Sequence, residues 1–68
     1  MITYKKLWIL LKERKIKKGE FTAICGLSSA TVAKLVKNER IWTPVIEKIC
    51  KGLKVQPGDI MEYIETEE

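Results

Sequence analysis

The sequence predicts an all-α fold, a compact bundle of five short helices that forms a single domain over residues 1–68. Apolar residues recur at helical spacing along most of the chain, and residues suited to helix ends separate these apolar segments. No internal repeat, low-complexity tract or linker is visible. A chain of 68 residues has room for one domain with a small core.

The first predicted helix follows Thr3, which is a plausible N-cap. Its apolar residues recur at i, i+3, i+4 and i+7, and they are Tyr4, Leu7, Trp8 and Leu11. This spacing is typical of an amphipathic helix of about three turns. Trp8 is most simply interpreted as an anchor in the core.

A second helix is predicted over about 18–25, and a sharp bend follows it. Its inward face is formed by Phe21, Ile24 and Cys25. Gly26 ends the helix, because glycine accepts the left-handed conformation of the position after the last turn. Ser28 is a good N-cap for the next helix, and Leu27 with Val32 matches a hydrophobic staple.

The third predicted helix, over 29–37, has two distinct faces. At about 100° per residue, an inward face groups Val32, Leu35 and Val36, whereas Ala30, Lys34 and Lys37 lie nearly opposite. A merely solubilising surface would more often mix Glu with Lys at i, i+4, but this helix carries no acid before Glu39. The outward face is therefore small at its start and basic towards its end.

Two further helices are predicted in the last third of the chain. Thr43 is the expected N-cap of the fourth, with Pro44 at its first position. Its apolar stripe consists of Val45, Ile46, Ile49, Cys50 and Leu53. The turn over 56–59 leads to a short fifth helix that carries Ile60, Met61 and Ile64, and 65–68 form an acidic tail.

Charge is distributed unevenly along the chain. Residues 1–40 carry ten Lys or Arg against three Glu, and residues 41–68 carry three Lys against six Asp or Glu. A basic first half favours a polyanionic partner on one side of the molecule, although a solvated surface would have the same composition. An enzyme is not expected, because we find no histidine, paired carboxylates, phosphate-binding loop or nucleophile with a base. No catalytic residue is therefore assigned.

The two cysteines do not indicate a metal site. Cys25 and Cys50 lack a CxxC spacing and a nearby histidine, so we predict that both are small core hydrophobes, with no metal or other cofactor. The longest apolar run, over 7–11, is too short for a membrane span or a signal peptide. A cytoplasmic protein with reduced thiols, and with no membrane or small-molecule partner, is the expectation.

At this level of detail the chain resembles a known family. The tract KKGEFTAICGLSSATVAKLVKNE, over 17–39, is similar to the helix-turn-helix of the phage repressor and Cro-type (XRE-like) DNA-binding domains. The tract WTPVIEKICKGLKVQPGDIMEY, over 42–63, resembles the two helices that follow in compact bacterial members. The matching positions are Glu20, Phe21, Cys25, Gly26, Leu27, Val32 and Leu35. The resemblance implies a lambda-repressor-like domain with its helix-turn-helix at about 18–37, in a compact bacterial or phage protein.

The resemblance also implies a set of DNA contacts, because the third helix of this family lies in the major groove. The implied base-reading residues are Ser28, Ser29, Ala30, Thr31 and Lys34. The implied phosphate contacts are Lys17, Lys18, Lys37, Asn38 and Arg40. Some members carry glutamine in the first base-reading positions, whereas Ser29 and Ala30 are short here. Lys34 is consequently the main candidate for reading a base.

Two functional hypotheses remain open. In the first, the protein is a transcription regulator that occupies a palindromic operator as a homodimer, with Trp42, Met61, Tyr63 and Ile64 as candidates for the dimer contact or for ordinary core. In the second, the helix-turn-helix is a protein-interaction module, similar to an antitoxin or a phage inhibitor, with weak or no specific DNA binding. Duplex DNA is the partner that the first hypothesis requires.

Overall fold

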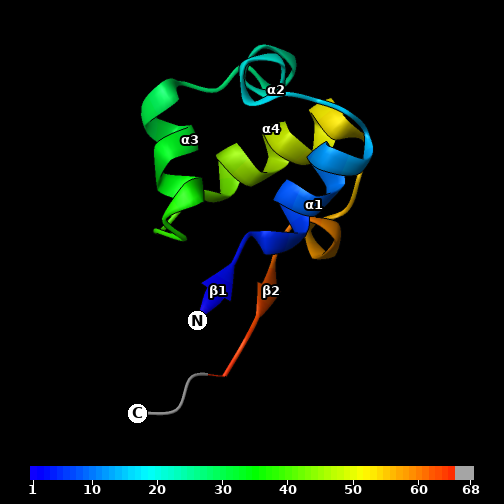
Figure 1. Ribbon diagram of the computed structural model, residues 1–68. Helices are drawn as coiled ribbons and strands as arrows, with labels where there is room; N and C mark the ends of the chain where they lie inside the picture. The colour runs from blue at the N-terminus through cyan, green and yellow to red at the C-terminus, as the bar shows by residue number, and fades with distance from the viewer. Residues whose placement is uncertain (66–68) are drawn as a thin grey trace.

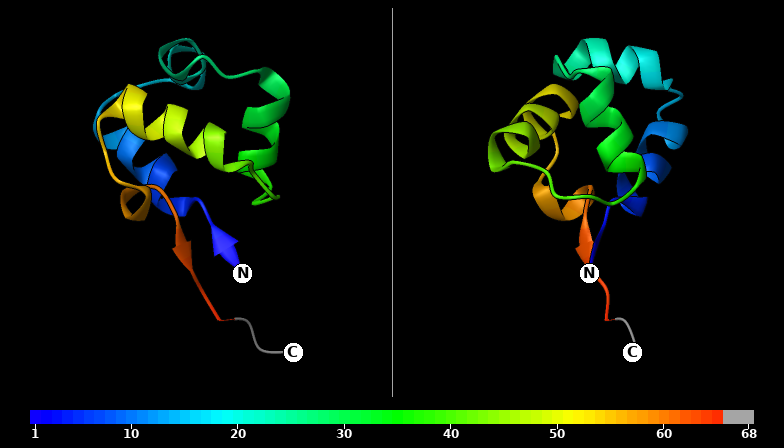
Figure 2. Two further views of the ribbon diagram at one scale, coloured as in Figure 1. Left: turned by 180° about the vertical axis from the view of Figure 1, so that it is seen from behind. Right: turned by 90° about the vertical axis from the view of Figure 1, so that its left-hand side faces the viewer.

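The computed structural model describes residues 1–65, which form four α-helices and a short antiparallel sheet (Figure 1). The helices are α1 (Lys5–Glu13), α2 (Lys18–Cys25), α3 (Ser29–Val36) and α4 (Thr43–Leu53), followed by the 3-10 turn η1 (Pro57–Asp59). The strands are β1 (Ile2–Thr3) and β2 (Glu62–Tyr63). Figure 2 confirms from two further sides that α2 lies at one end of the molecule and the sheet at the opposite end.

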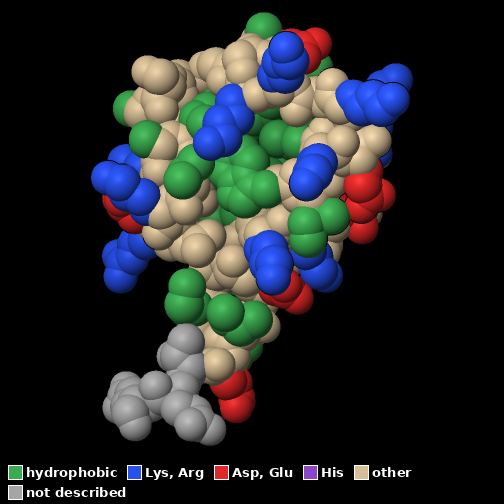
Figure 3. Space-filling view, in the orientation of Figure 1, with side chains coloured by type: hydrophobic (Ala, Val, Ile, Leu, Met, Phe, Trp, Pro, Cys, Tyr) green, Lys and Arg blue, Asp and Glu red, His purple; other side chains and the backbone are tan. Residues whose placement is uncertain are grey.

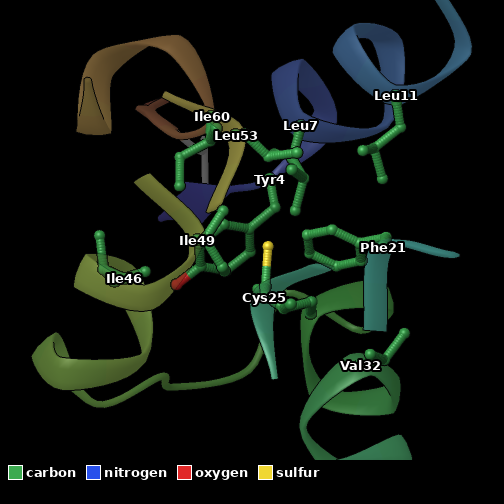
Figure 4. Packing of buried hydrophobic residues seen from close by; sticks show 11 residues of the cluster. Tyr4, Leu7, Leu11, Phe21, Cys25, Val32, Ile46, Ile49, Leu53 and Ile60 are labelled. Atoms are coloured by element: carbon green, nitrogen blue, oxygen red, sulfur yellow. The ribbon is translucent and has the colours of Figure 1, made fainter. Parts of the chain in front are cut away.

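Every helix contributes to one core (Figure 4). The largest fully buried side chains are Leu7 from α1, Phe21 from α2, Leu35 from α3, Ile49 from α4 and Ile60 after η1. The predicted apolar stripes of α1 and α4 are confirmed by the burial of Tyr4, Leu7, Leu11, Ile46, Ile49 and Leu53. Because each helix is short, only a narrow stripe of each is covered.

Two predicted core residues instead lie on the surface. Ile24 is 49% exposed and Val36 is 48% exposed. The buried stripe of α3 is centred between Val32 and Leu35, and Val36 falls at its edge, where no element covers it fully. The inward face of α2 is likewise restricted to Phe21 and Cys25.

The bend between α2 and α3 has the predicted chemistry. Gly26 adopts the left-handed conformation with φ of 64°, and the Ser28 hydroxyl oxygen accepts a hydrogen bond from the Thr31 N–H at 3.2 Å. At α4 the prediction was wrong by one position, because Thr43 is already helical and Trp42 occupies the cap without a side-chain hydrogen bond. The helix therefore begins through Pro44 in its first turn rather than through a threonine cap.

The predicted fifth helix does not form. The Gln56 N–H donates to the Asp59 carboxylate at 2.9 Å and closes the single turn η1, after which the chain extends into β2. This strand pairs antiparallel with β1, with Ile2 opposite Tyr63 and Thr3 opposite Glu62. Pairing with the opposite end of the chain satisfies backbone groups that a helix of only a few residues would leave open. Of the predicted acidic tail, 66–68 lie outside the described residues.

Helices α2 and α4 pack closely at Gly52. A Cβ atom at this glycine would lie 2.8 Å from the Cys25 sulfur and 3.2 Å from the Ile24 carbonyl oxygen. At the end of α4, the Arg14 guanidinium donates to the Leu53 carbonyl oxygen at 2.6 Å and so caps the helix C-terminus. The close approach at Gly52 holds α2 against α4 and thereby positions the bend. The Arg14 hydrogen bond joins the end of α1 to the end of α4. Within residues 1–65, no helix is both long and apolar enough to cross a membrane.

Candidate nucleic-acid interface

The outward face of α3 is small and basic. Ser29, Ala30, Ala33 and Lys34 are all exposed, and so is Lys37 at the C-cap of the helix. Since α3 contains no acidic residue and neither lysine has a carboxylate within 4.0 Å among residues 1–65, the two lysines give this face a positive charge. Such a face attracts a polyanion and leaves its first turn free for close approach.

At the start of α3, two predicted base-reading side chains contact each other. The Ser28 and Thr31 hydroxyl oxygens lie 3.0 Å apart and share a hydrogen bond, in addition to the bond from the Thr31 N–H. These hydroxyls therefore help to begin the helix. Ser29, Ala30 and Lys34 are the predicted base-reading residues whose side chains make no hydrogen bond of their own within residues 1–65.

The start of α2 carries two of the predicted phosphate contacts. The Lys17 N–H donates to the Glu20 carboxylate at 3.1 Å, which fixes the first turn. Both lysine side chains are exposed, and the Lys18 ammonium lies 5.4 Å from the centre of the Trp8 ring. Later in α2 the Thr22 hydroxyl donates to the Lys18 carbonyl oxygen at 2.8 Å, so this threonine is satisfied within its own helix.

The loop after α3 carries the remaining predicted phosphate contacts. Asn38 has a φ of 55°, and its side-chain oxygen accepts a hydrogen bond from the Tyr4 N–H at 3.0 Å. Asn38 therefore joins this loop to the start of α1, and only its amide NH2 remains for a phosphate. Arg40 is exposed. Its role as a phosphate contact stays a prediction, as do those of the other nine predicted DNA-binding residues.

An apolar hollow of about 480 Å³ lies between α1, the start of α2 and the end of α3. It is lined by Trp8, Leu11, Lys12, Ile16, Lys18 and Val36. Figure 3 shows apolar side chains at the centre of this face with Lys and Arg side chains around them. Neither the exposure of Val36 nor the position of the Lys18 ammonium over the Trp8 ring can be predicted from the sequence, because no local pattern links residues on separate helices.

The four candidate dimer residues differ in exposure. Trp42 is 78%, Tyr63 67% and Ile64 40% exposed, whereas Met61 is half-buried and packs against the core. Exposed aromatic side chains are enriched at protein interfaces. Trp42, Tyr63 and Ile64 thus remain available for contact with a partner, and Met61 belongs chiefly to the edge of the core.

The thiols are not activated for chemistry. Burial raises the pKa of the Cys25 thiol, and the neighbouring Cys50 raises it further. Burial also raises the pKa of the Cys50 thiol, with a smaller contribution from Asp59. Both cysteines are free, and the residues that the structure describes include no group of three or more Cys, Asp or Glu placed to hold a metal ion.

Helices α2 and α3 form a tightly packed helix-turn-helix, and the second helix of the motif, α3, is exposed and basic. This arrangement is typical of helix-turn-helix DNA-binding domains. Comparison with known families identifies the family. Residues 6–66 match the Cro/C1-type HTH DNA-binding domain, and the chain belongs to this family.

Two similar proteins are transcriptional regulators. The chain is 36% identical over 62 residues to YozG of Bacillus subtilis (strain 168), an uncharacterized HTH-type transcriptional regulator, with 88% of this chain and 74% of that protein covered. It also resembles the crystal structure of the transcriptional regulator VanUg with a TM-score of 0.85 and 46% identity, which covers 90% of this chain and 81% of that one.

Proposed function

We propose that this protein is a sequence-specific regulator of transcription that binds double-stranded DNA and acts by occupying an operator. The exposed face of α3 is the observation that carries the proposal, because it combines a small first turn with Lys34, Lys37 and no acid. In this arrangement residues 29–37 lie in the major groove, and the start of α2 contacts the phosphate backbone.

Lys34 is the residue that we expect to read a base. It is exposed on the outward face of α3, one turn after the small residues Ser29 and Ala30. A lysine ammonium in the major groove can donate to guanine O6 and N7. Ala30 is small enough to contact a thymine methyl group. Few side chains therefore read bases, and most of the affinity comes from phosphates.

The phosphate contacts predict a steep dependence of affinity on salt. Lys17, Lys18, Lys37 and Arg40 are exposed around α2 and α3. If about four such contacts form per subunit, a dimer gives a log–log salt slope of roughly −7, at about −0.9 per phosphate.

A dimer is part of the proposal because one domain of this size covers few base pairs. Two copies on a palindrome would bind half-sites roughly 34 Å apart. The exposed side chains of Trp42, Tyr63 and Ile64 support a contact between copies near the α4 start or the sheet. Sedimentation equilibrium of the wild type and of Trp42→Ser tests which of these regions is used.

Selection from a random duplex library, followed by fluorescence anisotropy across a salt series, tests the main proposal. We expect one enriched palindromic motif and an affinity that falls steeply with salt. Recovery of no motif at any salt concentration would refute sequence-specific regulation. It would favour instead the alternative, in which the helix-turn-helix is a module that binds another protein.

A further inference from the structure

Trp8 differs from the fully buried residues around it. Leu7 and Phe21 are 0% exposed, whereas Trp8 is half-buried and lines the hollow beside α2. Its ring meets Phe21 edge to face, with ring centres 6.2 Å apart and an interplanar angle of 79°. One part of the indole is therefore locked into the core. The other part faces the hollow, where Lys18 lies.

The Lys18 ammonium lies over the ring of Trp8. Its nitrogen is 5.4 Å from the ring centre, within the distance at which a cation is attracted to an indole face. Among residues 1–65, Lys18 has no carboxylate within 4.0 Å. The indole is therefore the group that orients this side chain, which is otherwise exposed at the first position of α2.

We propose that Trp8 is a positioning residue for DNA binding, because its ring holds the Lys18 ammonium where a backbone phosphate arrives. This inference rests on the proposed DNA-binding function. The indole contacts one side of the ammonium, and the N–H groups on the other side can donate to phosphate oxygens. An ammonium that is already oriented loses less side-chain freedom when DNA binds. The rigid partner Phe21 keeps the ring itself in place.

A double-mutant cycle tests the proposal. Trp8→Leu is expected to weaken binding to the selected duplex about two- to fivefold at low salt, which corresponds to one exposed cation–π contact. The same substitution in a Lys18→Ala background is expected to leave affinity unchanged, since the ammonium is already absent. In a Lys37→Ala background the full effect should persist, because that lysine lies at the C-cap of α3, away from the start of α2. Trp8→Phe, which keeps an aromatic face, should retain part of the affinity.

Three measurements separate positioning from a loss of folding. Far-UV circular dichroism and the melting temperature establish that each variant is folded. In the free wild-type protein the Lys18 ε-methylene protons should show an upfield ring-current shift that Trp8→Leu abolishes. If Trp8→Leu unfolds the protein, Trp8→Met, which also removes the aromatic face but fills more of the same space, replaces it throughout the cycle.

The outcomes are distinct. If Trp8→Leu weakens DNA binding equally with and without the Lys18 side chain, the ring does not position that lysine. Tighter DNA binding after removal of the ring would also refute the proposal, because the ring would then compete with the phosphate for the Lys18 ammonium. Absence of any DNA binding by the wild type would refute the proposed function itself. If the wild type binds the selected duplex and the effects of Trp8→Leu and Lys18→Ala are coupled, the DNA-binding function and the positioning role of Trp8 are both supported.

Discussion

Replacing Gly52 by alanine tests how closely α2 and α4 pack. The added Cβ would lie 2.8 Å from the Cys25 sulfur, 3.2 Å from the Ile24 carbonyl oxygen and 3.3 Å from the Cys25 Cα. Two of these three atoms belong to the backbone of α2, which rotation of a side chain cannot move. One helix must therefore shift away from the other.

The size of the effect follows from two opposing contributions. In an open helix interior, alanine stabilises by about 1 kcal/mol relative to glycine. Extra volume in a well-packed contact costs about 1 to 3 kcal/mol, and the upper part of that range applies because the backbone is involved. We expect Gly52→Ala to lower the free energy of unfolding by about 1 to 2 kcal/mol. For a domain of this size, 1 kcal/mol corresponds to about 4 to 8 °C in melting temperature.

Urea and thermal unfolding followed by circular dichroism measure this effect. Gly19→Ala is the matched control, because a Cβ at that helical glycine meets nothing within 4 Å, and we expect it to stabilise by about 0.4 to 1 kcal/mol. In a Cys25→Ala background the cost of Gly52→Ala should shrink, since the nearest obstructing atom is gone. If Gly52→Ala is as stable as Gly19→Ala, the reasoning about α2–α4 packing is wrong.

Three further predictions concern the α3 region and the thiols. Lys34→Ala should flatten the sequence preference in a library selection, whereas Lys37→Ala should weaken all duplexes alike; equal changes in selectivity would contradict these roles. The free energy of unfolding of Asn38→Ala should be about 1 kcal/mol lower than that of Asn38→Gly, because alanine is strained at a φ of 55° and glycine is not. Urea unfolding of the two variants measures this difference. Since burial raises the pKa of both the Cys25 and Cys50 thiols, their contribution to stability is complete below the ordinary thiol pKa of about 8.5 and is lost as the pH rises from there through the raised pKa of the folded state. Urea unfolding at pH 7 and pH 9 should show this decrease, and Cys25→Ala should reduce it.

Local chemistry was sufficient to predict the helix-turn-helix. Gly26 and Ser28 act through their own backbone or through residues a few positions away, so their roles are visible in the chain itself. The match of residues 6–66 to the Cro/C1-type HTH domain agrees with this prediction. The boundaries of α2 and α3 were correct to within a residue for the same reason.

Contacts between distant residues could not be predicted in this way. The pairing of Ile2 with Tyr63 replaces the expected fifth helix, and no helical periodicity can indicate a partner at the other end of the chain. Likewise, the contact of the Lys18 ammonium with the Trp8 ring depends on how α1 packs against α2. The exposure of Val36 depends on where the small core ends. Each of these features is set by tertiary packing rather than by local preference.

The pairing of β1 with β2 also joins the two ends of the described chain. The Met1 amino group donates to the Ile64 carbonyl oxygen at 2.7 Å, and the Ile64 N–H donates to the Met1 carbonyl oxygen at 2.9 Å. Residues 1 and 64 therefore lie side by side, at the end of the molecule opposite α2 (Figure 1). A reporter or a second domain attached at either end would leave the fold from the same point, away from α2. A short peptide linker between these ends would turn the domain into a closed ring, from which circular permutants could be opened at any exposed loop.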